Sequence, residues 1–344
     1  MKRIRSIISL FMLGILITLS SVPAAEVNAQ TTLKAHFIDV GQGDAILLQY
    51  GSTNSLIDTG TEKNYSKLKT YLKKINVKKI TNLIITHPDS DHLGGADYVI
   101  KDYNVKKIYM TTYSSKSSEY KEMISAIKKY SVKRVNVKKD SKINIGGIKA
   151  NVLYTNTKAE DSNDSSIVLK LKHGKKSFLF TGDISAKVEK QIASKYNVNV
   201  DVLKVSHHGS SSSSAVSFVK ETSPQYSIVS VGAENNYGHP NANVVRRLDK
   251  YSKKVYRTDK NGTVVITSTG SKLSAKTVAT KGSSSSNSSS SSLGESTSVS
   301  PSSTVYITKT GKKYHKKACG SGTYSKTTLK KAKERGLTAC TKCY

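Results

Sequence analysis

A short polar segment that directly follows a predicted buried strand constrains this chain more than any other feature. Ile84-Ile85-Thr86 has the composition of a buried strand, and it runs into His87-Pro88-Asp89-Ser90-Asp91-His92 and Leu93-Gly94-Gly95. Two histidines and two aspartates within six residues can direct their side chains into one cavity when they follow a strand end. A polar surface turn is the alternative, but this density of ligand side chains disfavours it. The segment therefore predicts a metal site.

The chain from about Thr31 to Val278 alternates between strand-like and helix-like hydrophobic patterns. We expect strands at Leu33–Asp39, Ala45–Tyr50, Ser55–Asp58, Ile80–Thr86, Lys107–Thr111, Lys149–Tyr154, Ser166–Leu171, Ser177–Thr181, Val200–Ser206, Tyr226–Val231, Lys254–Arg257 and Thr263–Thr267. We expect helices at Tyr65–Ile75, Gly95–Tyr103, Ser118–Tyr130, Ala186–Tyr196, Ala215–Thr222 and Asn243–Tyr251. Early strands joined by short turns, followed by strands that alternate with helices, predict an α/β fold with two sheets flanked by helices.

The first residues have the composition of a targeting segment. Lys2, Arg3 and Arg5 precede an apolar run over residues 7–19, and small residues precede a cut after Ala29. This three-part pattern predicts a secretory signal peptide over residues 1–29, with an uncleaved membrane anchor as the alternative. We therefore expect a secreted or extracellular protein, with cell-wall association left open and no stable membrane span after cleavage.

The rest of the chain divides by composition. Residues 281–304 are mostly serine and cannot bury a core, so they predict a flexible linker. The linker separates a large domain over residues 30–280 from a small module over residues 305–344. The module holds all three cysteines of the chain and is its most densely basic part.

Charge points to the kind of partner. The chain has 55 Lys+Arg and 24 Asp+Glu among 344 residues, a formal net charge of +31. A large positive charge favours polyanions such as DNA or cell-wall teichoic acid. Genome composition or association with the wall could also explain the abundance of lysine. A hydrophobic content of 36% excludes a polytopic membrane protein.

The cysteines of the small module suggest a second metal site. His315 and Cys319 precede a helix-like stretch, and Cys340 and Cys343 follow it. Four such side chains can hold one structural zinc ion, which a module with so few large apolar residues needs. A disulfide that leaves the third cysteine over is the alternative, and the odd count disfavours it.

Several separated motifs resemble those of the metallo-β-lactamase superfamily. They are the HPDSDH segment, in which Asp89 stands where the second histidine of HxHxDH is usual, and the segments Leu56–Gly60, Phe178–Asp183 and Val205–Ser210. The resemblance implies an αββα sandwich and a metallohydrolase. The implied metal ligands are His87, Asp89, Asp91, His92, Asp183 and His207. Either His207 or His208 could be the last ligand, and we prefer His207 because it follows the strand directly.

One position departs from that pattern. The superfamily's middle histidine is missing between Asp91 and Asp183, and His173 belongs to a turn that we expect to be exposed. Asn163, Asp164 or Ser165 could take its place. A narrower resemblance accounts for the departures, since Phe37–Ala45, HPDSDH, Asn163–Leu169, HHGS and Tyr237–Pro240 resemble the C-terminal domain of the ComEC competence family. The resemblance runs from about Phe37 to Thr267, and the membrane domain of that family has no counterpart here.

The resemblance implies a mechanism. Two divalent metals, Zn or Mn, bridged by Asp183 would lower the pKa of a shared water. A carboxylate-rich site shifts the preference toward harder ions such as Mn. Catalytic roles fall to Asp91, and to His239, which could contact a phosphoryl oxygen or protonate the leaving group. We expect supporting roles for Asp39, Asp44, Asp58, Asn163 and His208.

These expectations combine into one function with two alternatives. We expect a secreted, monomeric, metal-dependent hydrolase, a phosphodiesterase or nuclease that acts on DNA. A hydrolase of cell-wall phosphodiesters, similar to phosphorylcholine esterases, is one alternative, and a non-catalytic DNA- or envelope-binding protein is the other. The small module resembles the metal-binding domain of the Ada repair protein. His315 stands where that domain's alkyl-accepting cysteine does, so we expect binding without methyl transfer.

Overall fold

The structure is a computed structural model that describes residues 32–233, 235–279, 304–308, 310–311, 313–315 and 323–340. The predicted signal peptide, nearly all of the Ser-rich linker, Cys319 and Cys343 lie outside these ranges. The described residues fall into two compact units, one on each side of the linker.

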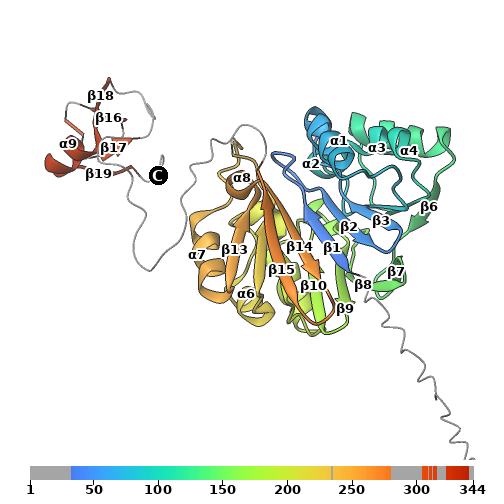
Figure 1. The fold of residues 1–344 in the computed structure, drawn as a ribbon. Coiled ribbons are helices and arrows are strands. Elements are labelled where there is room, and N and C mark those ends of the chain that lie inside the picture. Colours follow the sequence, from blue (N-terminus) through green and yellow to red (C-terminus); the bar gives the residue numbers. More distant parts are fainter. Residues whose placement is uncertain are drawn as a thin grey trace, which may run out of the picture. The chain divides into compact units, whose positions relative to one another are not determined.

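The first unit is built on two mixed sheets (Figure 1). Among the described residues, the first sheet has the order β15-β14-β1-β2-β3-β4-β5-β6 and the second the order β13-β12-β11-β10-β9-β8-β7. The strands of the first sheet are β1 (Leu33–Phe37), β2 (Ile46–Tyr50), β3 (Thr53–Ile57), β4 (Asn82–Ile85), β5 (Lys107–Met110), β6 (Lys133–Asn136), β14 (Thr263–Ser268) and β15 (Leu273–Val278). Those of the second are β7 (Lys142–Ile145), β8 (Ile148–Tyr154), β9 (Val168–His173), β10 (Lys176–Phe180), β11 (Val202–Lys204), β12 (Tyr226–Val229) and β13 (Lys254–Arg257).

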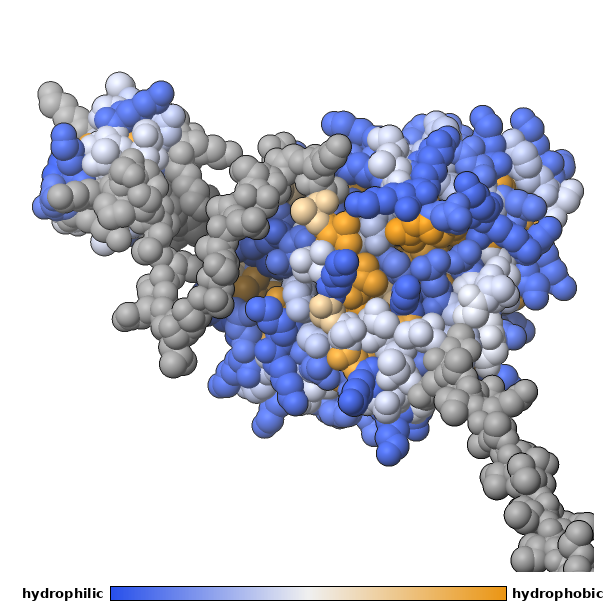
Figure 2. Space-filling model, in the orientation of Figure 1, coloured by the Kyte–Doolittle hydropathy of each residue, from blue (hydrophilic) through white to orange (hydrophobic). Residues whose placement is uncertain are grey.

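The strand β15 forms one edge of the first sheet. Figure 2 shows that hydrophilic residues cover most of the visible face of this unit, while hydrophobic ones gather where β14 and β15 run in Figure 1. Lys272 precedes β15 and Lys276 lies within it, and both are exposed. Lysines along a sheet edge discourage pairing with the edge of another copy.

Helices cover the outer face of each sheet. On the first sheet lie η1 (Glu62–Asn64), α1 (Tyr65–Lys74), α2 (Ser90–Leu93), α3 (Ala96–Asp102) and α4 (Ser118–Lys129). On the outer face of the second sheet lie α5 (Ala186–Ala193), α6 (Val216–Thr222) and α7 (Ala242–Tyr251). The short helices η2 (Asn163–Ser165), η3 (Ser206–Gly209) and α8 (Thr258–Asn261) lie in the connections before β9, after β11 and after β13. In α1, Leu68 and Leu72 lie one turn apart and are fully buried, so one stripe of the helix faces the sheet.

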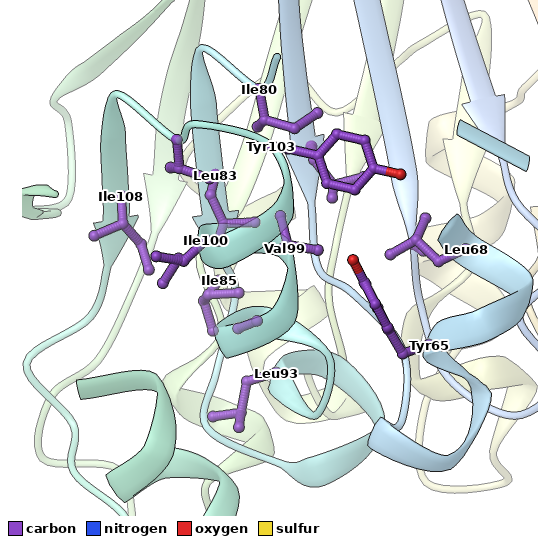
Figure 3. Packing of buried hydrophobic residues seen from close by; sticks show 14 of the residues in the cluster. Tyr65, Leu68, Ile80, Leu83, Ile85, Leu93, Val99, Ile100, Tyr103 and Ile108 are labelled. Atoms are coloured by element: carbon purple, nitrogen blue, oxygen red, sulfur yellow. The ribbon is translucent and has the colours of Figure 1, made fainter. Parts of the chain in front are cut away.

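Three apolar layers hold the unit together. Figure 3 shows the outer layer of the first sheet, where Leu83 and Ile85 of β4 pack against Val99 and Ile100 of α3. A second layer, which includes Phe37 and residues from both sheets, fills the space between them. The third lies between the second sheet and its helices. This helix–sheet–sheet–helix order confirms the expected αββα sandwich.

The second unit is a small sheet with one helix against it. Its strand order is β18-β16-β17-β19 among the described residues. Its elements are β16 (Thr304–Thr308), β17 (Lys313–His315), β18 (Tyr324–Thr328), α9 (Leu329–Glu334) and β19 (Thr338–Ala339). Val305, Ile307, Leu329 and Ala332 form its described core, which is small for a domain that folds by hydrophobic burial alone.

Candidate metal centre

The predicted site residues come together because both sheets end their parallel strands at the same place. In the first sheet β3 and β4 run parallel, so Asp58 and His87 follow neighbouring strand ends. In the second sheet β10, β11 and β12 run parallel, which places Asp183, His207 and Ser230 at successive strand ends. Side chains that follow the carboxyl ends of neighbouring parallel strands meet at one edge.

The turn after β4 depends on a close contact with the loop before β2. Gly43 has φ 115°, and a Cβ there would lie 2.2 Å from the backbone oxygen of Asp91. The backbone N–H of Asp44 donates to the same oxygen at 3.1 Å. Gly43 is therefore required for the loop to reach the turn, which explains the glycines of the Gly41-Gln42-Gly43 segment.

Four side chains form the centre of the site. The Oδ2 atom of Asp183 lies 3.3 Å from Nε2 of His92 and 3.1 Å from Nε2 of His208. Nε2 of His208 is also 3.2 Å from Oδ2 of Asp91, and the two Nε2 atoms of His92 and His208 are 3.3 Å apart. Two ligand atoms come from the first sheet and two from the second.

The outer nitrogen of each central imidazole has an acceptor. Nδ1 of His92 lies 2.8 Å from Oδ2 of Asp58, and Nδ1 of His208 lies 2.9 Å from the backbone oxygen of Ser230. Asp58 is itself fixed by the backbone N–H and the hydroxyl of Thr86, at 2.8 and 2.7 Å. Each ring thus donates from Nδ1 and turns the Nε2 lone pair toward the other ring and the carboxylates.

This arrangement fits divalent cations. Two lone pairs that face each other beside carboxylate oxygens repel unless a cation or protons lie between them. The buried Nε2 of His87 and Oδ1 of Asp183 also have no hydrogen-bond partner among the described residues. His87 faces Asp89, with Nε2 and Oδ2 3.7 Å apart. These atoms offer two neighbouring positions for a cation, with Asp183 between them.

The charges of the site also favour a bound cation. Burial alone would lower the pKa of His208, but the carboxylates of Asp183, Asp91 and Asp44 raise it to about 10. Against the effect of burial, His92 and His208 hold the pKa of Asp183 and Asp91 below its usual range. The cluster is therefore anionic until protons or metal ions neutralise it.

The two adjacent histidines occupy different positions. His207 and His208 have φ of 50° and 53°, in the left-handed region that is unusual for such residues. The side chain of His208 is 1% exposed, while that of His207 is 25% exposed with Nε2 4.0 Å from Oδ2 of Asp183. His208, for which we expected a supporting role, is thus nearer to Asp91 and Asp183 than His207 is.

A pocket of about 190 Å³ opens over the cluster. It is lined by Gln42, Asp89, Asp91, Asn163, Asp183, His207, His208, Tyr237 and His239. Asn163 therefore lies at the site. The neighbouring Asp164 instead accepts hydrogen bonds from the backbone and hydroxyl of Ser185, at 2.8 and 2.9 Å. Burial, followed by the charges of His207 and His208, lowers the pKa of His239 to about 4.

Two other residues lie away from the pocket. Asp39 accepts from the backbone N–H of Gly41 at 3.1 Å and lines a separate cavity of about 440 Å³ beside α1. His173 is 6% exposed, so the expectation of an exposed turn is wrong. Its Nδ1 lies 2.9 Å from the Ser268 hydroxyl and its ring packs against Tyr50, because the adjacent turn folds back onto β14.

Sequence reasoning missed one buried residue next to the site. Lys204 is 0% exposed, and its Nζ lies 2.7 Å from Oδ2 of Asp44. The other oxygen of Asp44 is 3.5 Å from Nδ1 of His208. The available signal was a single lysine among the apolar residues Val202, Leu203 and Val205. Such a lysine at the centre of a sheet needs a carboxylate partner.

Comparisons with known proteins agree with this geometry. Residues 38–233 match the model of the Metallo-beta-lactamase superfamily. The chain belongs to this superfamily. The solved metallo-beta-lactamase fold protein YhfI from Bacillus subtilis is 14% identical, with a TM-score of 0.47 over 65% of this chain and 95% of that one.

This chain is similar to further relatives over more than 200 residues. It is 31% identical over 247 residues to ComE operon protein 3 of Bacillus subtilis (strain 168), which covers 66% of this chain and 32% of that protein. It is 28% identical over 258 residues to Recombination protein 2 of Haemophilus influenzae, over 74% of this chain and 31% of that protein. The chain spans about a third of the length of these relatives. It is also 29% identical over 228 residues to Competence protein ComA of Neisseria gonorrhoeae, over 65% of this chain and 30% of that protein. The expected resemblance to the superfamily and to competence proteins is confirmed.

Among the described residues, no helix combines the length and the apolar composition that crossing a bilayer requires.

Proposed function

We propose that this metallo-beta-lactamase fold hydrolase is a metal-dependent phosphodiesterase that acts on nucleic acid, DNA first of all. The observation that carries the proposal is the convergence of imidazole nitrogens and carboxylate oxygens from two sheets beneath an open pocket. Relatives whose names refer to competence and recombination support DNA as the polymer.

The proposed ligands divide into two groups. Asp91, His92 and His208 would hold one cation, because their ligand atoms lie within 4.8 Å of one another. His87 and Asp89 would hold the other, with Asp183 shared between the two. We infer that Mn²⁺ suits the site at least as well as Zn²⁺, since half of these ligands are carboxylates. When bound, such ions acidify water and offset negative charge on a phosphoryl oxygen.

Other residues of the pocket would orient the phosphodiester. Asn163 and Gln42 present amide groups that can donate to phosphoryl oxygens. His239 is held by its backbone N–H, which donates to Oδ1 of Asn235 at 3.0 Å. A pKa of about 4 leaves its ring neutral at neutral pH, which favours contact with a phosphoryl oxygen over protonation of the leaving group. The side chain of Asp91 is partly exposed to the pocket, so a carboxylate oxygen can accept a hydrogen bond from the attacking water and orient it.

The surroundings of the reaction are part of the proposal. The net charge of +31 would draw a polyanion to the chain and make its affinity fall with salt. We infer export through the predicted signal peptide, and a competence-like role at the cell envelope fits the relatives' names. We infer a monomer, because the exposed lysines of β15 discourage pairing at that sheet edge.

Cleavage of DNA tests the proposal directly. The full chain, purified without chelator and supplied with Mn²⁺, is incubated with linear and circular DNA beside a His87→Ala/Asp183→Asn variant. We expect the wild type to degrade DNA and the variant to leave it intact. An intact substrate with two equivalents of metal bound would contradict the nuclease function and turn attention to cell-wall phosphodiesters.

We further propose that the second unit binds a structural zinc ion. His315 ends β17 and Cys340 follows β19, and these parallel strands pair Tyr314 with Ala339. The backbone N–H of Cys340 donates to the oxygen of Tyr314 at 2.9 Å, so the two proposed ligands occupy adjacent positions on neighbouring strands. Cys319 and Cys343, the other proposed ligands, lie outside the described residues.

The zinc content of the full chain tests this site. With the first unit loaded with Mn²⁺, we expect about one equivalent of zinc in the wild type and its loss in Cys340→Ser. Unchanged zinc in that variant would contradict the proposal.

A further inference from the structure

The pocket carries an exposed aromatic side chain that the metal chemistry does not use. Tyr237 is 69% exposed, more than the other exposed large hydrophobic residues described, Val216 at 46% and Tyr130 at 41%. It lines the same pocket as Asp91 and Asp183.

The ring of Tyr237 is the outermost of three that lead away from the cluster. It stacks on His239, with ring centroids 5.7 Å apart and planes 25° from parallel. The ring of His239 meets His207 edge to face, with centroids 5.6 Å apart and planes at 77°. One face of the tyrosine is therefore covered by an imidazole. Its high exposure leaves the other face open to a ligand.

The loop that carries this tyrosine is held in place by one side chain. Nδ2 of Asn235 donates to the backbone oxygens of Gly232 and His239, at 2.8 and 2.7 Å. Oδ1 of Asn235 accepts from the backbone N–H of His239 at 3.0 Å. These bonds tie both ends of the loop together. Binding a ligand at Tyr237 therefore loses little backbone entropy.

We propose that Tyr237, backed by His239, is a stacking platform for the base next to the phosphodiester bond that is cut. The preferred substrate is then single-stranded nucleic acid. An open aromatic face beside a site for phosphate is the arrangement that proteins use to bind unpaired bases without sequence preference. A duplex keeps its bases within its own stack and offers none to such a platform. The proposal rests on the phosphodiesterase function proposed above.

A base fits this surface better than a quaternary ammonium group does. Such cations are bound by several electron-rich rings that surround them. The rings next to Tyr237 are the imidazoles of His207 and His239, and a metal-loaded cluster would repel a cation. A neutral planar base meets neither obstacle.

The absence of tryptophan from the chain provides a clean measurement. The sequence contains no Trp, so Tyr237→Trp creates a single fluorescent reporter at the platform. In an Asp183→Asn background, to prevent cleavage, this variant is titrated with a short oligothymidylate and with an abasic deoxyribose phosphate oligomer of the same length. We expect oligothymidylate to quench the fluorescence at about tenfold lower concentration than the abasic oligomer. Tyr130→Trp in the same background is the matched control, and we expect no quenching there.

Cleavage supplies a second measurement that does not depend on the tryptophan. With active enzyme, we expect the wild type to have a KM about tenfold lower for oligothymidylate than for the abasic oligomer. Tyr237→Ala should nearly abolish this difference, Tyr237→Phe should keep it, and Tyr130→Ala should leave it as in the wild type.

The outcomes separate the two proposals. Cleavage without discrimination between the oligomers, together with equal quenching by both, overturns the platform and leaves the phosphodiesterase function standing. Quenching by oligothymidylate without cleavage by the active enzyme overturns the phosphodiesterase function, and with it the role of Tyr237 beside a cleaved bond, and leaves only base binding at Tyr237. The Tyr237→Trp variant is also titrated with phosphocholine. Quenching by phosphocholine but not by oligothymidylate overturns the platform in favour of a cation site.

Discussion

The buried lysine Lys204 positions Asp44 beside the candidate metal centre. Lys204 lies in the middle of the second sheet, where β11 pairs it with Phe180 on one side and Ile228 on the other. Burial alone would lower the pKa of Lys204, but Asp44 and Asp183 raise it, so the ammonium stays charged. Asp44 in turn lies beside His208. The lysine therefore acts on the site through Asp44, as a positioning residue.

Removing the charge of Lys204 should destabilise the fold. Lys204→Met leaves the buried carboxylate of Asp44 without its ion-pair partner, which we expect to lower the free energy of unfolding by about 3 kcal/mol. Urea denaturation of the full chain measures the change. The double variant Lys204→Met/Asp44→Asn should recover part of the loss, because no unpaired charge remains. The single variant Asp44→Asn is measured as well. If the double variant loses as much free energy of unfolding as Lys204→Met and Asp44→Asn lose together, the ion pair is not the cause.

The two adjacent histidines should differ in their effect on metal binding. His208→Ala removes an imidazole whose Nε2 lies within 3.3 Å of His92, Asp91 and Asp183. We expect it to weaken Mn²⁺ binding by more than tenfold, while His207→Ala changes the affinity much less. Isothermal titration of metal-free protein measures both affinities. A larger loss in His207→Ala would show that metal binding rearranges the turn.

At the scale of elements, one carboxylate fixes the loop that carries these histidines. Glu189 of α5 is fully buried and accepts from the Ser206 hydroxyl at 2.7 Å. It also accepts from the backbone N–H groups of Ser214 and Ala215, at 2.8 and 2.7 Å. The loop from β11 to α6 thus closes on a single side chain. The strained backbone of His207 and His208 persists because its surroundings hold it.

Glu189→Gln tests this anchor. One of the three donors would then face an amide N–H instead of an oxygen, so we expect about 2 kcal/mol of lost stability. Metal affinity should fall as well, since the loop positions His208. Thermal unfolding and metal titration measure the two effects, and the exposed Glu221→Gln serves as the control. Wild-type metal affinity in Glu189→Gln would show that the loop does not depend on the anchor.

Element positions also show where sequence patterns fail. The strands β6, β7 and β15 were not predicted, and all three lie at an edge of a sheet. β6 has exposed residues at three of its four positions, including Lys133 and Arg134. Its hydrophobic alternation is therefore weak. In contrast, β7 alternates between exposed and buried positions but has only four residues, so its pattern is too short to identify a strand.

At the scale of the whole first unit, the candidate metal centre spans the two sheets. His87, Asp91 and His92 follow β4 of the first sheet, while Asp183 and His208 follow strands of the second. Bound cations would therefore link the two halves of the sandwich. Without them, the facing carboxylates and lone pairs oppose the contact between the sheets.

Metal removal should consequently lower thermal stability. Ions bound at concentrations of 100 to 1,000 times their Kd stabilise a fold by about 3–4 kcal/mol. For a unit of this size that corresponds to a Tm lower by roughly 5–10 °C in EDTA. Scanning calorimetry of the first transition measures it. Asp183→Asn, which has lost the shared carboxylate, should respond less to EDTA, and an equal response would place the stabilising metal elsewhere.

The sequence by itself determined the ligand types and the strands after which they occur. His87, Asp89, Asp91 and His92 are close neighbours in the chain, and local backbone geometry at a strand end is enough to direct them together. The apolar strands and amphipathic helices likewise carry their own periodicity, which is why an α/β fold with two sheets flanked by helices was predictable.

Only the tertiary structure decided how the distant residues complete the site. That His208 lies nearer to Asp91 and Asp183 than His207 does depends on left-handed backbone conformations and on acceptors such as Ser230, which follows another strand. The pairing of Lys204 with Asp44 joins two sheets that no local pattern relates. The exposure of Tyr237 above the cluster is set by its loop. These features arise from contacts between segments far apart in the chain, and the energy of such contacts is not encoded in any one segment.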